Sequence, residues 1–291
     1  MDETSSIINI GELSKPAAVL VEKIADAIGG LARPWQIRRV AEAEAEAEKI
    51  HAVAQIEITK LQRRAVTRLI AEEARKQNNI ESITAKALPQ LSDEAKPENL
   101  EDDWIANFFD KCRLISDDEM QRLWAKILAE ETNSQGSFSK RTINLLAGLD
   151  KSEAVLFATL CRYNVTIGSP SPLVYDAQNP IYNQNGINFG SLSHLEVIGL
   201  IQFNNLTNFQ RLGIGAAKGY VAYFDQNLWI ELPGDMDWSL NLGRVILTSA
   251  GGQLASLCET KPVEGFAEYV QEQWKRFGYG TQPPPPVVGA P

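Results

Sequence analysis

Residues 116–132 read SDDEMQRLWAKILAEET, and this stretch determines the fold class expected for the first half of the chain. Ser116 and Glu119 match a capping box, with Ser116 at the N-cap, and Asp117 and Asp118 fall in the first turn, where the helix dipole favours negative charge. The pattern therefore predicts an amphipathic helix with a charged start. Its apolar residues are one, three or four positions apart, as on one helix face: Met120, Leu123, Trp124, Ile127 and Leu128.

One carboxylate of this helix needs a partner. Glu131 follows Ile127 by four positions and Trp124 by seven, so it lies on the apolar face, whereas Glu130 lies at the margin of that face. A carboxylate on a packing face is costly unless it is hydrogen-bonded. The next segment, GSFSKRT at 136–142, offers backbone amides, hydroxyls and two cations. We expect Glu131 to accept hydrogen bonds from this segment and so to fix the angle between two helices.

A chemical role for Glu131 is the alternative: a general base or a metal ligand, together with Asp102 or Asp103. Metal ligation normally needs several convergent ligands. No second helix shows the ExxH or ExxE spacing of a di-metal bundle. We therefore favour the structural role and predict no catalytic, cofactor-binding or metal-binding residue and no cofactor.

Helices are also predicted on both sides of this stretch. Residues 102–115 place Trp104 and four further apolar residues on one face. A third helix is predicted from 139 to 149 and a fourth from 152 to 161. The four helices together indicate a small helical bundle.

A long helix is predicted before the bundle, because residues 36–88 contain neither glycine nor proline. Its apolar residues form a narrow seam at seven-residue spacing, as in a coiled coil, and His51 lies in that seam as a packing residue. A hairpin that turns near Gln77, Asn78 and Asn79 is the alternative. Before it, an amphipathic helix is expected to begin near Pro16.

From about residue 165 the chain becomes rich in glycine, asparagine and β-branched residues. The stretch 191–203 predicts a helix that ends at Gly199 and is followed by a strand. The stretch 243–257, GRVILTSAGGQLASL, predicts a strand, a turn at 249–252 and a helix, with one or two strands in 220–232. The order helix, strand, strand, helix resembles a winged-helix module, and the GLI and LT-x-x-G pieces resemble those that flank the wing in many bacterial regulators.

Composition narrows the function classes. The 291 residues carry a net charge of −9, which argues against a general nucleic-acid binder. Three distant cysteines and two histidines favour neither a disulfide framework nor a zinc site. The acidic start of the chain does not fit a secretory signal, and no phosphate-loop, dinucleotide or nucleophile-elbow motif is present.

Residues 77–91, 102–131 and 136–157 resemble an uncharacterised bacterial family, domain-of-unknown-function family 2806. The layout is also similar to the abortive-infection alpha group of phage-defence proteins, which have an apolar helix, an Ala/Glu-rich helix and a tryptophan-containing helix in this order. Neither resemblance supplies a catalytic residue. The positions that match the first family are treated as structural: Trp104, Gln121, Trp124, Glu131, Ser137, Phe138 and Ser139.

The expected fold is mainly α, with a long N-terminal helix and a small helical bundle followed by a C-terminal winged-helix-like α/β module. The expected segments are a flexible N-terminus with a short amphipathic helix (1–35), a long helix or hairpin (36–90), a bundle (100–164), the winged module (165–260), a helix (261–278) and a disordered proline-rich tail (279–291).

The expected function is that of a non-enzymatic bacterial interaction protein, a sensor, adaptor or effector in phage defence or stress. It would act in the cytoplasm or at the inner-membrane surface through a protein partner and through homo-oligomers. Two alternatives stay open: membrane association through residues 16–35, and DNA binding by the winged module. The helix near residues 191–200 has no lysine or arginine, which disfavours nucleic acid as a partner.

Overall fold

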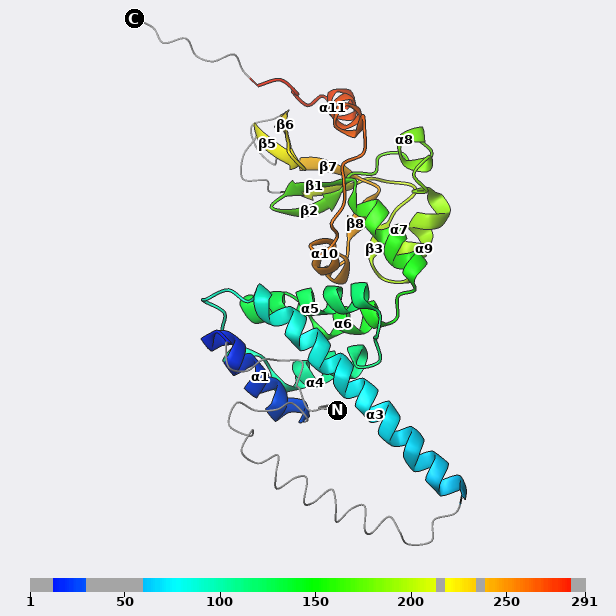
Figure 1. The fold of residues 1–291 in the computed structure, drawn as a ribbon. Coiled ribbons are helices and arrows are strands. Elements are labelled where there is room, and N and C mark those ends of the chain that lie inside the picture. Colours follow the sequence, from blue (N-terminus) through cyan, green and yellow to red (C-terminus); the bar gives the residue numbers. More distant parts are fainter. Residues whose placement is uncertain (1–12, 30–59, 213–217, 234–238, 284–291) are drawn as a thin grey trace, which may run out of the picture. The chain divides into compact units, whose positions relative to one another are not determined.

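The computed structural model describes residues 13–29, 60–212, 218–233 and 239–283 (Figure 1). The chain divides into two compact units, Met1–Ala147 and Gly148–Pro291. The described residues are mainly helical, and the second unit adds small antiparallel sheets, so the expected fold class is confirmed at this level.

All regular elements among the described residues of the first unit are helices, joined by loops. Its elements are α1 (Lys15–Ile28), α3 (Lys60–Ala87), the 3-10 turns η3 (Leu88–Gln90) and η4 (Pro97–Asn99), α4 (Asp102–Cys112), α5 (Asp118–Asn133) and α6 (Lys140–Ala147).

Helix α1 has clear local causes at both ends. Ser14 caps its first turn by accepting from the Ala17 amide, and Gly29 ends it at a φ of 72°. Leu20 and Ile24 on its apolar face are fully buried, and α1 packs against α4 and η4. The face that would anchor α1 in a membrane is therefore occupied by its own unit.

Helix α3 runs without a break through residues 77–79, so the alternative prediction of a hairpin turn there is wrong. Asn79 is buried inside the helix rather than exposed in a turn. Its side chain donates to the Arg113 carbonyl at 2.9 Å and to Ser116 Oγ at 3.3 Å. His51 and most of the predicted seam lie outside the described residues.

Aromatic side chains form the centre of this unit. Trp104 and Phe108 of α4 are stacked with ring centroids 5.1 Å apart, and Phe108 meets Trp124 of α5 edge to face at 5.3 Å. Such pairs add about 0.5–1.5 kcal/mol to the stabilisation from burial alone. The apolar face predicted from the sequence is thus the packing face of α5.

The second unit begins with a helix that the sequence places in the bundle. Its elements are α7 (Lys151–Cys161), β1 (Asn164–Ile167), β2 (Ser169–Pro172), α8 (Pro180–Asn183), α9 (Phe189–Val197), β3 (Ile201–Phe203), β4 (Phe209–Leu212), β5 (Lys218–Tyr223), β6 (Gln226–Glu231), β7 (Ser239–Gly243), β8 (Val245–Leu247), α10 (Ser249–Ala255) and α11 (Phe266–Arg276).

The strands of this unit form three antiparallel sheets. One has four strands in the order β2-β1-β5-β6, and the pairs β3-β8 and β4-β7 form two further sheets. Tyr163, Tyr182 and Phe266 pack against one another in the core, with ring centroids 4.9 to 6.1 Å apart. The hydroxyl groups of the two tyrosines donate to backbone carbonyls at 2.7 Å, so their burial leaves no polar atom unpaired.

The predicted turn at 249–252 is wrong, because these residues are the first turns of α10. Thr248 is the N-cap and accepts from the Gly251 amide at 3.0 Å. Its hydroxyl also lies 2.7 Å from the Gly199 carbonyl oxygen and 3.1 Å from that of Leu200. A Cβ on Gly251 would lie only 1.9 Å from Leu200 O, so the start of α10 and the connection between α9 and β3 meet backbone to backbone.

The ordered chain also extends past α11. Glu231 of β6 and Gly280 exchange two backbone hydrogen bonds of 2.8 Å. The predicted disordered tail therefore does not begin at residue 279. Residues 284–291, with all but one of the prolines of this tail, lie outside the described residues.

Candidate functional site

Phe138 is held at both of its backbone polar atoms by residues of the sequence motif. Trp104 Nε1 donates to the Phe138 carbonyl at 2.7 Å, and the Phe138 amide donates to Glu131 Oε2 at 2.7 Å. The side chain of Phe138 is itself buried. Helices α4 and α5 thereby fix the loop that leads into α6.

Glu131 uses its second oxygen on the same loop. Oε1 accepts from the Gly136 amide at 2.8 Å, and Gly136 has a φ of 89°, which favours glycine. Burial raises the pKa of this carboxyl, which is 4% exposed, while hydrogen bonds from the Gly136 and Phe138 amides oppose the rise. The backbone partners lie where the sequence places them. Of the two cations, Lys140 lies instead 3.8 Å from Asp103.

The two serines of the motif shape the loop locally. Ser137 Oγ donates to the Ser134 carbonyl at 2.6 Å, and Ser139 Oγ accepts from the Thr142 amide at 3.2 Å in the first turn of α6. The Ser139 bond satisfies an amide donor that the start of α6 leaves without a partner, and the Ser137 bond satisfies the carbonyl of Ser134, the C-cap of α5. Both serines therefore have structural partners at the joint between α5 and α6.

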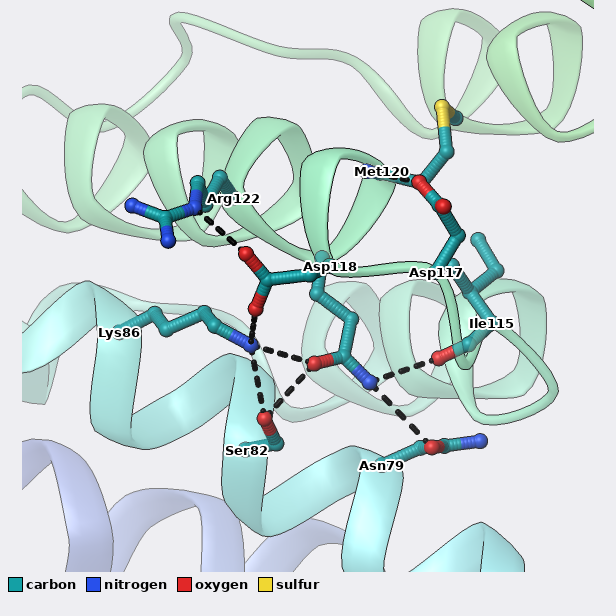
Figure 2. A network of polar contacts seen from close by, with 9 residues as sticks. Asn79, Ser82, Lys86, Ile115, Asp117, Asp118, Met120 and Arg122 are labelled. Carbon is teal, nitrogen blue, oxygen red and sulfur yellow. Dashed lines mark hydrogen bonds and ion pairs between the residues drawn. The ribbon is translucent and has the colours of Figure 1, made fainter.

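Gln121 forms a separate polar network between α5 and α3 (Figure 2). Its Oε1 accepts from Ser82 Oγ at 2.7 Å and from Lys86 Nζ at 2.5 Å. Its Nε2 donates to the Ile115 carbonyl at 2.9 Å and to Asn79 Oδ1 at 3.3 Å. Gln121 is 4% exposed, so a long polar side chain is buried with both ends of its amide satisfied.

Charged residues form ion pairs next to this network, as Figure 2 shows. Asp118 pairs with Arg122 at 2.8 Å and with Lys86 at 3.0 Å, and these two cations lower the pKa of its carboxyl. The N-cap of α5 is Asp117, which accepts from the Met120 amide at 3.0 Å, so the prediction of Ser116 as N-cap is wrong. The Ser116 hydroxyl instead accepts from Asn79.

The sequence interpretation missed three members of this network, Asn79, Ser82 and Lys86. The hairpin alternative placed Asn79 in a turn and so hid the pattern. The signal was present in the spacing, because residues three and four positions apart share a helix face. A continuous helix with Asn79, Ser82 and Lys86 in a row predicts a polar stripe that must meet polar partners.

The two joints act as connections between helices. Trp124 is fully buried between them, and its Nε1 has no hydrogen-bond partner within the described part of the chain. No cluster of three or more His, Cys, Asp or Glu side chains that could hold a metal ion occurs among the described residues. Each side-chain oxygen of Glu131 and Gln121 accepts a hydrogen bond from the protein itself, and both side chains are buried. These contacts support a structural role for both residues.

An exposed apolar face on the first half of α3 is the clearest surface feature of this unit. Leu61, Val66, Leu69 and Ile70 are 68%, 47%, 56% and 64% exposed. By helical spacing this is the same face that carries the buried Ile83 and its neighbours in the second half of α3. Figure 1 shows the first half of α3 running beyond the other helices of its unit.

None of the helices in the described segments is both long and apolar enough to cross a membrane. Neither a curated protein sequence nor a solved structure matches the chain. A family model does match, from α3 to α11, and it includes all seven motif residues. That model is described as "Protein of unknown function (DUF2806)" and covers residues 63–271, so the chain belongs to the DUF2806 family.

Proposed function

We propose that this protein is a non-enzymatic interaction protein, a sensor, adaptor or effector in bacterial phage defence or stress, and that it works through protein contacts and self-association. The exposed apolar face of α3 carries this proposal. Four large apolar side chains lie on ten consecutive positions of one helix, and they remain open to solvent. Contiguous exposed apolar surface of this kind marks interaction sites.

The energy available from this face is of the size that association requires. Full burial of one large apolar side chain is worth about 1.5–3 kcal/mol. Four partly exposed side chains on each of two copies would yield on the order of 10 kcal/mol before the cost of association is subtracted. The occupant that we propose is a second copy of the chain, because the same apolar face on a second α3 would offer a matching surface.

The test compares two glutamate substitutions on one helix. Leu69→Glu places a charge in the middle of the apolar face. Ala71→Glu adds the same charge on the opposite, exposed side of α3. The molar mass of each full-length variant in solution is measured by light scattering after size exclusion, over a range of concentrations. We expect wild type and Ala71→Glu to form dimers or larger oligomers and Leu69→Glu to be monomeric.

A monomeric wild-type protein would refute self-association through α3. The defence role is tested separately, by the efficiency of phage plating on bacteria that express each variant. Glu131→Gln serves there as a second probe. If it abolished protection without lowering the melting temperature, Glu131 would have a chemical role and the non-enzymatic proposal would fail.

A DNA-binding regulator is the second candidate, and the pairing of β3 with β8 favours it. Ile201 and Leu247 pair in register, with α9 before β3 and α10 after β8, and this order supports the candidate. The exposed residues of α9 include Phe189, His194 and Val197 but neither lysine nor arginine. Salt-dependent retardation of duplex DNA would support this candidate.

Membrane association through residues 16–35 is the remaining alternative. It would require α1 to leave α4, because Leu20 and Ile24 are buried there. Binding to vesicles of anionic phospholipid that is lost on deletion of residues 1–35 would support it.

A further inference from the structure

Two thiols of the second unit line one cavity of about 230 Å3. Cys161 is the last residue of α7 and is buried, whereas Cys258 follows the end of α10 and is partly exposed. Asn164 also lines this cavity, and its Oδ1 is buried without a hydrogen-bond partner in the described part of the chain. Phe224, another lining residue, has a φ of 51°, an unusual conformation for a residue other than glycine.

Hydrogen bonds hold the two chain segments beside each other. Arg162 Nε donates to the Lys261 carbonyl at 3.2 Å. Tyr223 bridges the same segments, because its hydroxyl donates to the Arg162 carbonyl at 3.0 Å and accepts from the Val263 amide at 2.7 Å. Three hydrogen bonds, two of them through Tyr223, thus link Arg162, directly after Cys161, to residues 261–263, shortly after Cys258.

The two thiols line the same cavity. Interaction with the Cys258 thiol and, second, burial raise the pKa of Cys161 well above its ordinary value. Cys258 Sγ also lies 3.6 Å from the Leu254 carbonyl oxygen. Two thiols that line one cavity, on segments tied together by hydrogen bonds, are placed for a disulfide, which needs the two Cα atoms within about 7 Å of each other.

We propose that Cys161 and Cys258 form a reversible intramolecular disulfide when the protein meets a low-molecular-weight disulfide such as oxidised glutathione. Cys258 is the entry point because it is the more exposed of the two. Its thiolate attacks one sulfur of the oxidant, the oxidant's S–S bond breaks, and one glutathione thiolate leaves and takes up a proton. The product is a mixed disulfide on Cys258.

Cys161 then completes the exchange. It loses its proton to solvent, its thiolate attacks Cys258 Sγ, and the second glutathione leaves as a thiolate that takes up a proton. In total two protein S–H bonds are replaced by one S–S bond, and one oxidised glutathione is reduced to two thiols. Because the attacking species is the thiolate, the reaction is slow at neutral pH and accelerates as the pH rises.

The protein contains its own control. Cys112 is buried in the first unit, and burial raises the pKa of its thiol, so it has neither access nor a partner thiol among the described residues. The full-length protein is incubated with oxidised glutathione at mildly alkaline pH, and the remaining thiols are alkylated. We expect intact mass to show loss of two hydrogen atoms and peptide mapping to join Cys161 to Cys258, with Cys112 alkylated after unfolding.

Two variants separate the steps. Cys161→Ser should stop at the mixed disulfide, with one glutathione on Cys258, and Cys258→Ser should lose no thiol. The disulfide in the wild-type protein closes a long loop, so the melting temperature of the second unit should rise by roughly 5–10 °C and return after reduction. Retention of all three thiols, a stable glutathione adduct on wild-type Cys258, or a disulfide between two molecules would overturn the proposal. Because the wild-type result stands alone, a variant that fails to fold leaves it decisive.

Discussion

Gly251 and Gly252 are neighbours in α10 but should respond in opposite ways to substitution by alanine. A Cβ on Gly252 would meet no atom within 4 Å. A Cβ on Gly251 would lie 1.9 Å from the Leu200 carbonyl oxygen and 3.0 Å from its carbon. Neither glycine has a positive φ, so the two variants differ in steric surroundings rather than in backbone conformation.

The expected magnitudes follow from these distances. Gly252→Ala should raise the free energy of unfolding of the second unit by about 0.5–1 kcal/mol, because alanine loses less backbone entropy in a helix. In Gly251→Ala the Leu200 carbonyl has to retreat by about 1.5 Å to reach an ordinary separation. That movement costs about 1–3 kcal/mol in overpacking. It also disrupts the 3.1 Å bond from the Thr248 amide to Leu200 O, for a further loss of about 0.5–1.5 kcal/mol.

Amide hydrogen exchange measures this difference within the second unit alone. The protected amides of β3 and β8 are followed by mass spectrometry, because these strands lie on either side of the contact. We expect Gly251→Ala to be less stable than Gly252→Ala by on the order of 3 kcal/mol. Equal protection in the two variants would refute the close approach of α10 to the Leu200 carbonyl.

Three further predictions concern the first unit and use the same exchange measurement, with the second unit as the internal reference. Glu131→Ala leaves the amides of Gly136 and Phe138 without their acceptor and should cost about 2–4 kcal/mol; unchanged protection of α6 would contradict this role. Gln121→Ala should cost about 1–3 kcal/mol. Lys86→Met removes a partly exposed ion pair and one hydrogen bond to Gln121 Oε1, which keeps its bond from Ser82, so it should cost less than Gln121→Ala; the reverse order would refute Gln121 as the centre of the network. Burial raises the pKa of Glu131 above its ordinary 4.5, so the folded state holds this proton more tightly. The contribution of Glu131 to stability is therefore greatest below pH 4.5 and falls as the pH rises through the folded pKa, and the difference between wild type and Glu131→Gln should fall with pH in this window; a rise would contradict the sign.

The α-helical half of the fold followed closely from the sequence, because amphipathic spacing is a local property. Helix α5 and its buried face, and the position of Glu131 on that face, depend on residues within two turns of one another. The partners of Glu131 were also within reach of prediction, because Gly136 and Phe138 follow it by five and seven positions.

The predictions from the sequence were wrong where a polar group forms its hydrogen bond with a residue far away along the chain. Ser116 matches an N-cap, yet its hydroxyl accepts from Asn79, and Asp117 caps α5 instead. Asn79 reads as a turn residue, yet it lies inside α3 because the Arg113 carbonyl satisfies its side chain. A local pattern cannot register a hydrogen-bond partner more than thirty residues away.

The sequence by itself determined the helices of the first unit, the buried face of α5, the place of Glu131 and the resemblance to the family. Only the tertiary structure decided which of the two adjacent glycines of α10 is required, which face of α3 stays open at Leu69, and that Cys161 lines the same cavity as Cys258. The physical reason is common to all three. Steric contact, exposure and thiol pairing depend on the distance in space between segments far apart along the chain, whereas helix formation and capping depend mainly on neighbours within a few residues.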